Sequence, residues 1–247
     1  EIRDLTFSYV PDSPPALDGI NLHIAPGQTL GILGRTGSGK STLAALLPRI
    51  FNPPRGTVFI DGIDVLDLPL ELLRRSIAVV PQESFLFSRT VGENIAFAPG
   101  EWTDEQIRQA ARTAQVEQDI LEFLPQGYET MVGERGVTLS GGQRQRVGLS
   151  RAILKDAPIL VLDDCLSAVD TATEQRILNG LRPVMRDRTT LIISHRVAAV
   201  KAADQIIVLE RGRIAESGTH DELVALGGRY FRTYQRQQLE EAIASLE

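Results

Sequence analysis

Short apolar runs, bounded by glycine, proline or polar residues, recur along the chain. Runs of four or more apolar residues are typical of parallel strands that are covered on both faces. Buried strands are therefore expected at 28–33 (QTLGIL), 76–82 (SIAVVPQ), 159–163 (ILVLD), 189–194 (TTLIIS) and 205–210 (QIIVLE). Further short strands are expected at 2–10, 19–25 and 56–62, the first two separated by a proline-rich turn.

Helical patterns dominate a long middle segment and the C-terminal tail. Two capping boxes mark helix starts, Thr103 with Gln106 and Thr219 with Glu222. An apolar helix is also expected at 41–51. The pattern predicts an α/β fold with a parallel-sheet core. The expected divisions are 1–83 with 156–228 as core and β subdomain, 84–155 as a helical subdomain, and 229–247 as a polar C-terminal helix.

Composition narrows the class of protein. The 247 residues fit one large α/β domain with a smaller insertion, and 43% of them are hydrophobic, which suffices for a substantial core. The net charge of −6 argues against general nucleic-acid binding. The single cysteine, Cys165, fits a small buried residue in a reducing compartment. The chain opens within a strand pattern, so we expect it to be a segment of a longer protein.

A glycine-rich stretch follows the buried strand at 28–33 and precedes the apolar helix. It matches the phosphate-loop pattern G-x-x-x-x-G-K-[ST], in which backbone N–H groups and a helix N-terminus bind phosphate. Lys40 is expected to reach the β- and γ-phosphates, and the Ser41 hydroxyl to ligate Mg²⁺. The predicted nucleotide-binding residues here are Gly34, Arg35, Thr36, Gly37, Ser38, Gly39, Lys40, Ser41 and Thr42.

Two adjacent acids end the strand at 159–163. Asp163 ends a buried strand; taken alone, an acid there more often caps a helix or sits in a turn, but in a chain with a phosphate loop it is the expected Mg²⁺ acid. Neighbouring residues of a strand point to opposite sides, so Asp164 is expected to face away from Asp163 and to need another role. Tyr9 lies in an alternating strand, and either stacking on adenine or a place in the core fits its position.

The stretch LSGGQRQRVGLSRAIL (139–154) places a serine and two glycines at a helix start that no strand precedes. Such a start is a second anion site, distant in sequence from the phosphate loop. Together these motifs resemble the nucleotide-binding domain of an ABC transporter, with a P-loop (RecA-like) core, an N-terminal antiparallel β subdomain and an inserted helical subdomain. The resemblance covers nearly the whole chain and implies that two such domains pack head to tail around ATP and Mg²⁺.

The resemblance implies a role for each matched residue. Tyr9 would stack on adenine, Gln82 would sense Mg²⁺ and the attacking water, and His195 would contact the γ-phosphate. Ser140, Gly141, Gly142 and Gln143 would clamp the partner's ATP, and residues 167–170 would cross the dimer interface. The segment GERG (133–136) resembles exporters, in which it touches a membrane domain; that domain is expected upstream, at the cytoplasmic face of the cell membrane.

Asp164 departs from the family pattern, in which glutamate is the catalytic base. The aspartate side chain is one methylene shorter, and misplacement by about 1 Å can lower a rate about 10²-fold. The change resembles the slow, degenerate site of heterodimeric exporters, whose partner carries the catalytic glutamate. A backbone shift or a bridging water could restore the base, and the retained Gln82 and His195 count against complete loss of activity.

Two other classes of protein share these motifs. An ATP-gated clamp of DNA repair or chromosome proteins needs a long coiled-coil insertion, and residues 84–155 are too short and lack heptads. A regulatory, nearly inactive ATP-binding subunit is compatible with the exporter hypothesis and depends on Asp164. The transported compound and the organism are not encoded in these patterns.

Overall fold

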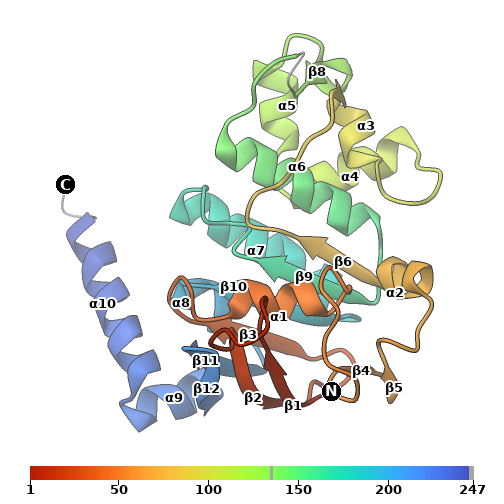
Figure 1. Ribbon diagram of the computed structural model, residues 1–247. Coiled ribbons are helices and arrows are strands. Elements are labelled where there is room, and N and C mark those ends of the chain that lie inside the picture. Colours follow the sequence, from red (N-terminus) through yellow and green to blue (C-terminus); the bar gives the residue numbers. More distant parts are fainter. Residues whose placement is uncertain (134–135, 245–247) are drawn as a thin grey trace. The chain divides into compact units, whose positions relative to one another are not determined.

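The computed structural model describes residues 1–133 and 136–244 (Figure 1). The chain divides into two compact units, residues 1–74 with 189–247 and residues 75–188. The second unit includes the strands at 77–80 and 159–163, which were predicted to belong to the nucleotide-binding core. The division into core and helical subdomain stays a prediction.

The first unit is built on a largely parallel sheet. Its strands lie in the order β12-β11-β3-β10, and β12 is antiparallel to β11. Their bounds are β3 Thr29–Leu33, β10 Thr189–Ser194, β11 Gln205–Glu210 and β12 Arg213–Gly218. The first three confirm the predicted strands. β12 was not predicted, because its side chains alternate between exposed and half-buried and include only two apolar residues.

A smaller antiparallel part precedes this sheet in the sequence. β1 (Ile2–Phe7) pairs with β2 (Leu17–Leu22), which confirms the predicted N-terminal antiparallel pair. Both strands end earlier than predicted. A single strand was predicted over 56–62. The structure instead has two paired strands of two residues each, β4 (Phe59–Ile60) and β5 (Ile63–Asp64).

The helices of the first unit are mostly short. α1 (Lys40–Leu46) ends before Pro48, whereas a helix over 41–51 was predicted. The correction has its cause at Pro48, which has no N–H and cannot donate the helical hydrogen bond to the Ala44 carbonyl oxygen, and Arg49 after it has a left-handed φ of 53°. The others are α8 (Val197–Val200), α9 (His220–Leu226) and α10 (Arg229–Ala244). The last three residues of the predicted C-terminal helix lie outside the described residues.

α2 (Leu70–Ser76) leads in the sequence from the first unit into the second. In the second unit β6 (Ile77–Val80) pairs in parallel with β9 (Ile159–Asp163), as the apolar runs predicted. The helices are α3 Val91–Ile95, α4 Asp104–Thr113, α5 Glu117–Phe123, α6 Gly141–Leu154 and α7 Thr171–Met185. A 3-10 turn at Gly127–Glu129 and the strand pair β7 (Arg89–Thr90) and β8 (Met131–Val132) complete it.

Helix α6 is the centre of the helical part of the second unit, where it packs against α3 and α4 (Figure 1). Its buried residues include Val147, Leu149 and Ala152. The capping boxes predicted for α4 and α9 are confirmed. Within the described ranges 1–133 and 136–244, no helix has the length and apolar character needed to cross a membrane.

Candidate functional site

The glycine-rich loop joins β3 to α1, and its backbone excludes larger residues. A Cβ atom at Gly34 would lie 2.5 Å from Ser38 Oγ and 2.6 Å from the Leu209 carbonyl oxygen. Gly39 has a φ of 104°, and a Cβ there would lie 2.6 Å from the Ala16 carbonyl oxygen. The loop is therefore wrapped so tightly that its backbone, rather than side chains, forms the concave surface.

Lys40 lies at the first position of α1 and is buried. Its Nζ donates hydrogen bonds to the carbonyl oxygens of Gly34 (2.8 Å) and Arg35 (2.9 Å), which holds the ammonium group over the loop. Within the described chain, the buried Ser38 Oγ has no hydrogen-bond partner, and no side chain caps α1 at Gly39. A buried ammonium, an unsatisfied hydroxyl and an uncapped helix start together fit an anion.

Tyr9 stands beside this loop. Its hydroxyl and Thr42 Oγ1 are 2.9 Å apart, and its side chain is 52% exposed. The ring meets Phe7 and Phe51 edge to face, with centroids 5.2 and 5.1 Å away. This exposure excludes a core position and leaves ring surface open to a planar ligand. Sequence reasoning missed Phe51, because it was assigned to a helix that in fact ends at Leu46.

His195 follows β10 directly, and its side chain is exposed. The parallel register pairs Ser194 with Leu33, the residue before Gly34. His195 therefore leaves the sheet at the edge where the phosphate loop begins. The first unit thus brings together Tyr9, the loop and His195.

In the second unit, Ser140 caps α6. Its Oγ accepts a hydrogen bond from the Gln143 backbone N–H (3.2 Å), and the Gln143 side chain accepts one from the Ser140 N–H (3.0 Å). Gln143 Nε2 also donates to Asp119 Oδ2 (3.0 Å). The Gln143 side chain is thus engaged within its own unit. A Cβ at Gly142 would lie 2.8 Å from the Ala168 carbonyl oxygen, so the backbone at the start of α6 packs closely against the loop at 167–170.

A buried glutamine that sequence reasoning missed ties three segments together. Gln145 Nε2 donates to the Gln82 carbonyl oxygen (2.9 Å) and to Ser167 Oγ (3.2 Å), and its Oε1 accepts from the Ala168 N–H (3.1 Å). The Gln82 side chain itself is exposed. Gln145 thus fixes the backbone of Gln82 and of the 167–168 loop to α6. Only its place inside the LSGGQRQR stretch could have pointed to it.

The two adjacent acids occupy different backbone conformations. Asp163 is the last residue of β9 and is buried, whereas Asp164 lies beyond the strand with a φ of 47°. The expectation that the two alternate along one strand is therefore wrong, because the strand ends between them. Aspartate is several-fold enriched in this left-handed region, since its short side chain can bond locally.

The loop after Asp164 ends in another helix cap. Asp170 Oδ1 accepts a hydrogen bond from the Thr173 N–H (2.9 Å) at the start of α7. Hydrogen bonds from Thr173 hold the pKa of Asp170 below its usual value. The second unit thus carries Gln82, residues 140–143, Asp163 and Asp164.

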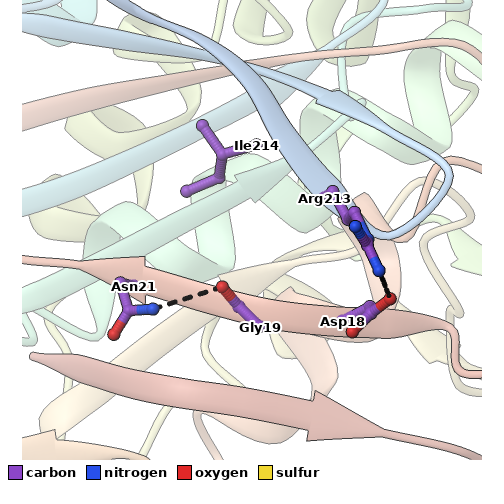
Figure 2. A pocket seen from close by; sticks show the side chains of 5 residues that line it. All are labelled: Asp18, Gly19, Asn21, Arg213 and Ile214. Carbon is purple, nitrogen blue, oxygen red and sulfur yellow. Dashed lines mark hydrogen bonds and ion pairs between the residues drawn. The ribbon is translucent and has the colours of Figure 1, made fainter.

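An open hollow lies elsewhere on the first unit, between β2 and β12 (Figure 2). Its lining residues are Asp18, Gly19, Asn21, Arg213 and Ile214. Arg213 donates to Asp18 Oδ2 (2.8 Å) and Asn21 Nδ2 to the Gly19 carbonyl oxygen (3.2 Å), as Figure 2 shows. These groups satisfy one another, and none is a predicted site residue.

A model of the ABC transporter family matches residues 17–167, which include the phosphate loop, the start of α6 and both acids. The chain belongs to the ABC transporter family. Its fold is accordingly the ABC ATPase fold, a mixed α/β sheet with a parallel core, as predicted. Within GERG, Glu134 and Arg135 lie outside the described residues.

Curated ABC relatives are similar over almost the whole chain. An "ATP-dependent lipid A-core flippase" of Aromatoleum aromaticum is 47% identical over 241 residues, which cover 98% of this chain and 40% of that protein. A "Probable multidrug resistance ABC transporter ATP-binding/permease protein YheI" of Bacillus subtilis is 46% identical over 97% of this chain and 42% of that protein. The chain thus spans about two fifths of these relatives.

The solved structure of a bacterial Atm1-family ABC exporter with ATP bound superposes with a TM-score of 0.91. The two sequences are 41% identical. The matched region covers 96% of this chain and 41% of the exporter chain. This likeness confirms the ABC ATPase fold predicted from the sequence.

Proposed function

We propose that the chain is the ATP-binding and ATP-hydrolysing domain of an ABC exporter, and that it binds Mg-ATP at the phosphate loop. The geometry of that loop carries the proposal: Gly34 admits no Cβ, and Lys40 is held over the loop by two carbonyl bonds. The anion-binding character of this loop supports ATP as ligand, and the exposed ring of Tyr9 supports adenine stacking.

The Mg²⁺ site is proposed at Ser41, Gln82 and Asp163. The buried carboxylate of Asp163 suits a hard cation that keeps several waters and phosphate oxygens as ligands. Bound there, Mg²⁺ would neutralise charge on the phosphates. The chain's own groups then have separate tasks: Lys40 binds phosphate, Asp164 accepts a proton from the attacking water, and His195 contacts the γ-phosphate.

We further propose that two such domains dimerise head to tail, so that Ser140 to Gln143 face the partner's ATP. The capped start of α6 supports this role. Its capping box leaves the Ser140 O–H as a donor, while the oxygen already serves the Gln143 N–H. The names of the relatives, a flippase and an ATP-binding/permease protein, support an upstream transmembrane domain and a place at the cytoplasmic face of the membrane.

The finer proposal concerns Asp164. Its shorter side chain is expected to make this chain's own site slow, with the partner a non-identical subunit that carries a glutamate. The backbone at Asp164 is left-handed, which an aspartate adopts more readily than a glutamate. This conformation is a physical reason for aspartate to persist at this position even though it reaches less far.

The rival function, an ATP-gated clamp of DNA repair or chromosome proteins, lacks support. Such a clamp needs a long coiled coil, and the helices described between residues 91 and 154 have five to 14 residues each. A sustained heptad seam requires several consecutive heptads.

The phosphate-loop proposal is tested by calorimetric titration with Mg-ATP. We expect Lys40→Ala to weaken binding about 10- to 100-fold, because a charge-assisted hydrogen bond contributes about 1.5–3 kcal/mol. Lys201→Ala is the matched control, since Lys201 is exposed and lies outside the loop. Equal affinities for the Lys40→Ala chain and the control would reject the phosphate-loop assignment.

The Asp164 proposal is tested by the steady-state ATPase rate of the isolated, purified domain, without its partner. We expect turnover at this chain's own site below the common range of about 1–10³ s⁻¹. Asp164→Glu is expected to raise it, because the longer side chain restores the reach of the base. Brisk hydrolysis by the wild type, with no gain from Asp164→Glu, would contradict the slow-site proposal.

A further inference from the structure

Gln237, on helix α10, forms hydrogen bonds with the backbone of the residues on both sides of Arg196. Gln237 Nε2 donates a hydrogen bond to the His195 carbonyl oxygen (2.8 Å). Gln237 Oε1 accepts one from the Val197 N–H (2.7 Å). Both partners are backbone groups, one able only to accept and the other only to donate, so the orientation of the amide is unambiguous.

The second of these bonds caps a helix. Val197 is the first residue of α8, whose N-cap residue, Arg196, makes no side-chain cap of its own. The first N–H groups of a helix need partners from outside it. Gln237 supplies one across 40 residues of sequence. Ser194 Oγ accepts the neighbouring Arg196 N–H (3.0 Å), so the segment at 194–197 is held from two directions.

The helix that presents Gln237 is itself anchored. Glu216, on β12, accepts hydrogen bonds from the Arg229 and Tyr230 backbone N–H groups at the start of α10. Tyr230 is completely buried, and its hydroxyl is 2.7 Å from His220 Nδ1. Gln237 follows Tyr230 by seven residues, about two helical turns, and therefore lies on the same face. The Gln237 amide therefore projects from a helix whose start is anchored by hydrogen bonds and by a buried side chain.

We propose that Gln237 is a positioning residue for His195, through which α10 sets the direction in which the histidine leaves the sheet. His195 is exposed, and the direction of its backbone limits where the ring can reach. The inference rests on the proposed function, in which His195 contacts the γ-phosphate. It gives the C-terminal helix a task in nucleotide discrimination: a correctly placed His195 favours ATP, which has a γ-phosphate, over ADP, which has none.

The test is the ratio of ATP to ADP affinity at this chain's own phosphate loop in the assembled transporter. ATP and ADP compete against a photoreactive ATP analogue, and the label on this chain is counted. This equilibrium readout does not depend on how fast Asp164 supports hydrolysis. We expect Gln237→Ala to lower the ATP preference about fivefold, since one hydrogen bond contributes about 1 kcal/mol, while ADP affinity is unchanged. A general loss of structure would weaken both nucleotides.

Two variants of α10 isolate the amide. Gln235→Ala is the matched control, because Gln235 is an exposed glutamine on the same helix, and it is expected to leave the ratio unchanged. Gln237→Glu keeps the side-chain volume and the acceptor for the Val197 N–H, but turns a carboxylate oxygen toward the His195 carbonyl. It is expected to lower the ratio at least as much as Gln237→Ala, and a wild-type ratio in Gln237→Glu would overturn the proposal.

A double variant separates this inference from the function on which it rests. His195→Ala is expected to lower the ratio at least as much as Gln237→Ala, and adding Gln237→Ala to it is expected to change the ratio less than twofold. If His195→Ala leaves the ratio unchanged, the role proposed for His195 fails. If His195→Ala lowers the ratio but Gln237→Ala behaves like Gln235→Ala, the positioning role of Gln237 alone is wrong. The positioning role would also be overturned if Gln237→Ala lowered the ATP/ADP affinity ratio by the same factor in the wild type and in His195→Ala.

Discussion

The starts of α1 and α6 are both glycine-rich, and both were predicted as anion sites, yet they are finished differently. The N-cap residue of α1 is Gly39, which has a φ of 104° and provides no side-chain cap. The N-cap residue of α6 is Ser140, which forms a reciprocal capping box with Gln143. The start of α1 thus has no side-chain cap from the described chain, whereas the start of α6 is capped by Ser140 and Gln143.

The difference fits a division of labour. A helix start without a side-chain cap gains most from an anion, because the anion satisfies N–H groups that have no other side-chain acceptor. A self-capped start keeps its shape before any ligand arrives, and can be offered ready-made to the nucleotide of another subunit. We therefore expect changes at α1 to act on this chain's own ATP, and changes at α6 to act on the partner's.

The largest expected effect comes from Ser140→Arg. It removes the capping hydroxyl and puts a bulky side chain where the partner's γ-phosphate is proposed to sit. We expect it to lower the steady-state ATPase rate of the reconstituted transporter more than 100-fold, in the range seen when a transition-state donor is removed. The affinity of this chain's own loop for ATP is expected to stay within twofold.

Asp164→Ala is the contrasting change in the same assay. Because the site built on Lys40 and Asp164 is proposed to contribute little turnover, we expect a loss of less than about threefold, against the roughly 10²-fold expected of a well-placed catalytic base. If Asp164→Ala and Ser140→Arg are equally damaging, the two sites are equivalent, and a homodimer with an aspartate base becomes the better account.

Gly39→Ala tests the tightly wound start of α1. The new Cβ would be forced into a left-handed backbone 2.6 Å from the Ala16 carbonyl oxygen. We expect a loss of about 2–4 kcal/mol in unfolding free energy, measured by urea denaturation, together with weaker ATP binding. Gly37→Ala is the matched control: its φ is 79°, but no atom lies within 4 Å of the added Cβ. Equal losses would show that the close approach to Ala16 is unimportant.

Ser140→Ala tests the capping box of α6 without adding bulk. Loss of an N-cap hydroxyl typically costs about 1 kcal/mol, so we expect a loss of that size in urea denaturation. Thr103→Ala removes the equivalent cap of α4 and is expected to cost a similar amount. Only Ser140→Ala is expected to lower the turnover of the assembled transporter. The same turnover in both variants would limit Ser140 to a structural cap.

The smallest expected effect concerns a third helix start, that of α7, where the cap is charged. Bonds from Thr173 lower the pKa of Asp170. The folded state therefore binds this proton less readily than the unfolded state, so the contribution of Asp170 is present above the ordinary aspartate pKa of about 3.9 and is lost as the pH falls through the lower folded value.

The measurement is thermal unfolding of wild type and Asp170→Asn between about pH 6 and about pH 3, a range that brackets the ordinary aspartate pKa. Asparagine can cap without titrating, so the wild-type advantage is expected to shrink as the pH falls. A difference between the two proteins that stays constant over this range would remove the charged cap from the account.

The fold was predictable because its strands are nearly continuous apolar runs. The runs at 189–194 and 205–210 match β10 and β11 residue for residue. The capping boxes at Thr103 and Thr219 were predictable for a similar reason, since both partners lie within one helical turn. Local patterns that determine local structure were therefore recovered.

Contacts between residues far apart in the sequence were not predicted. Gln145 reaches back 63 residues to the Gln82 carbonyl, and Gln237 reaches back 42 residues to the His195 carbonyl. A polar side chain on a helix has no local signal that separates a solvated position from one that binds a distant backbone. Asp164 and Phe51 were misplaced for a related reason, because the ends of elements depend on packing as well as on propensity.

The central claim is that the loop at Lys40 and the helix start at Ser140 serve two different nucleotides. The direct measurement is the number of ATP molecules retained by the assembled transporter after rapid gel filtration, for Lys40→Ala, Ser140→Arg and the two changes combined in this chain. We expect each single change to lose one nucleotide and the combined change to lose both. If the doubly changed chain loses only one, both residues contact the same nucleotide, and the head-to-tail account is wrong.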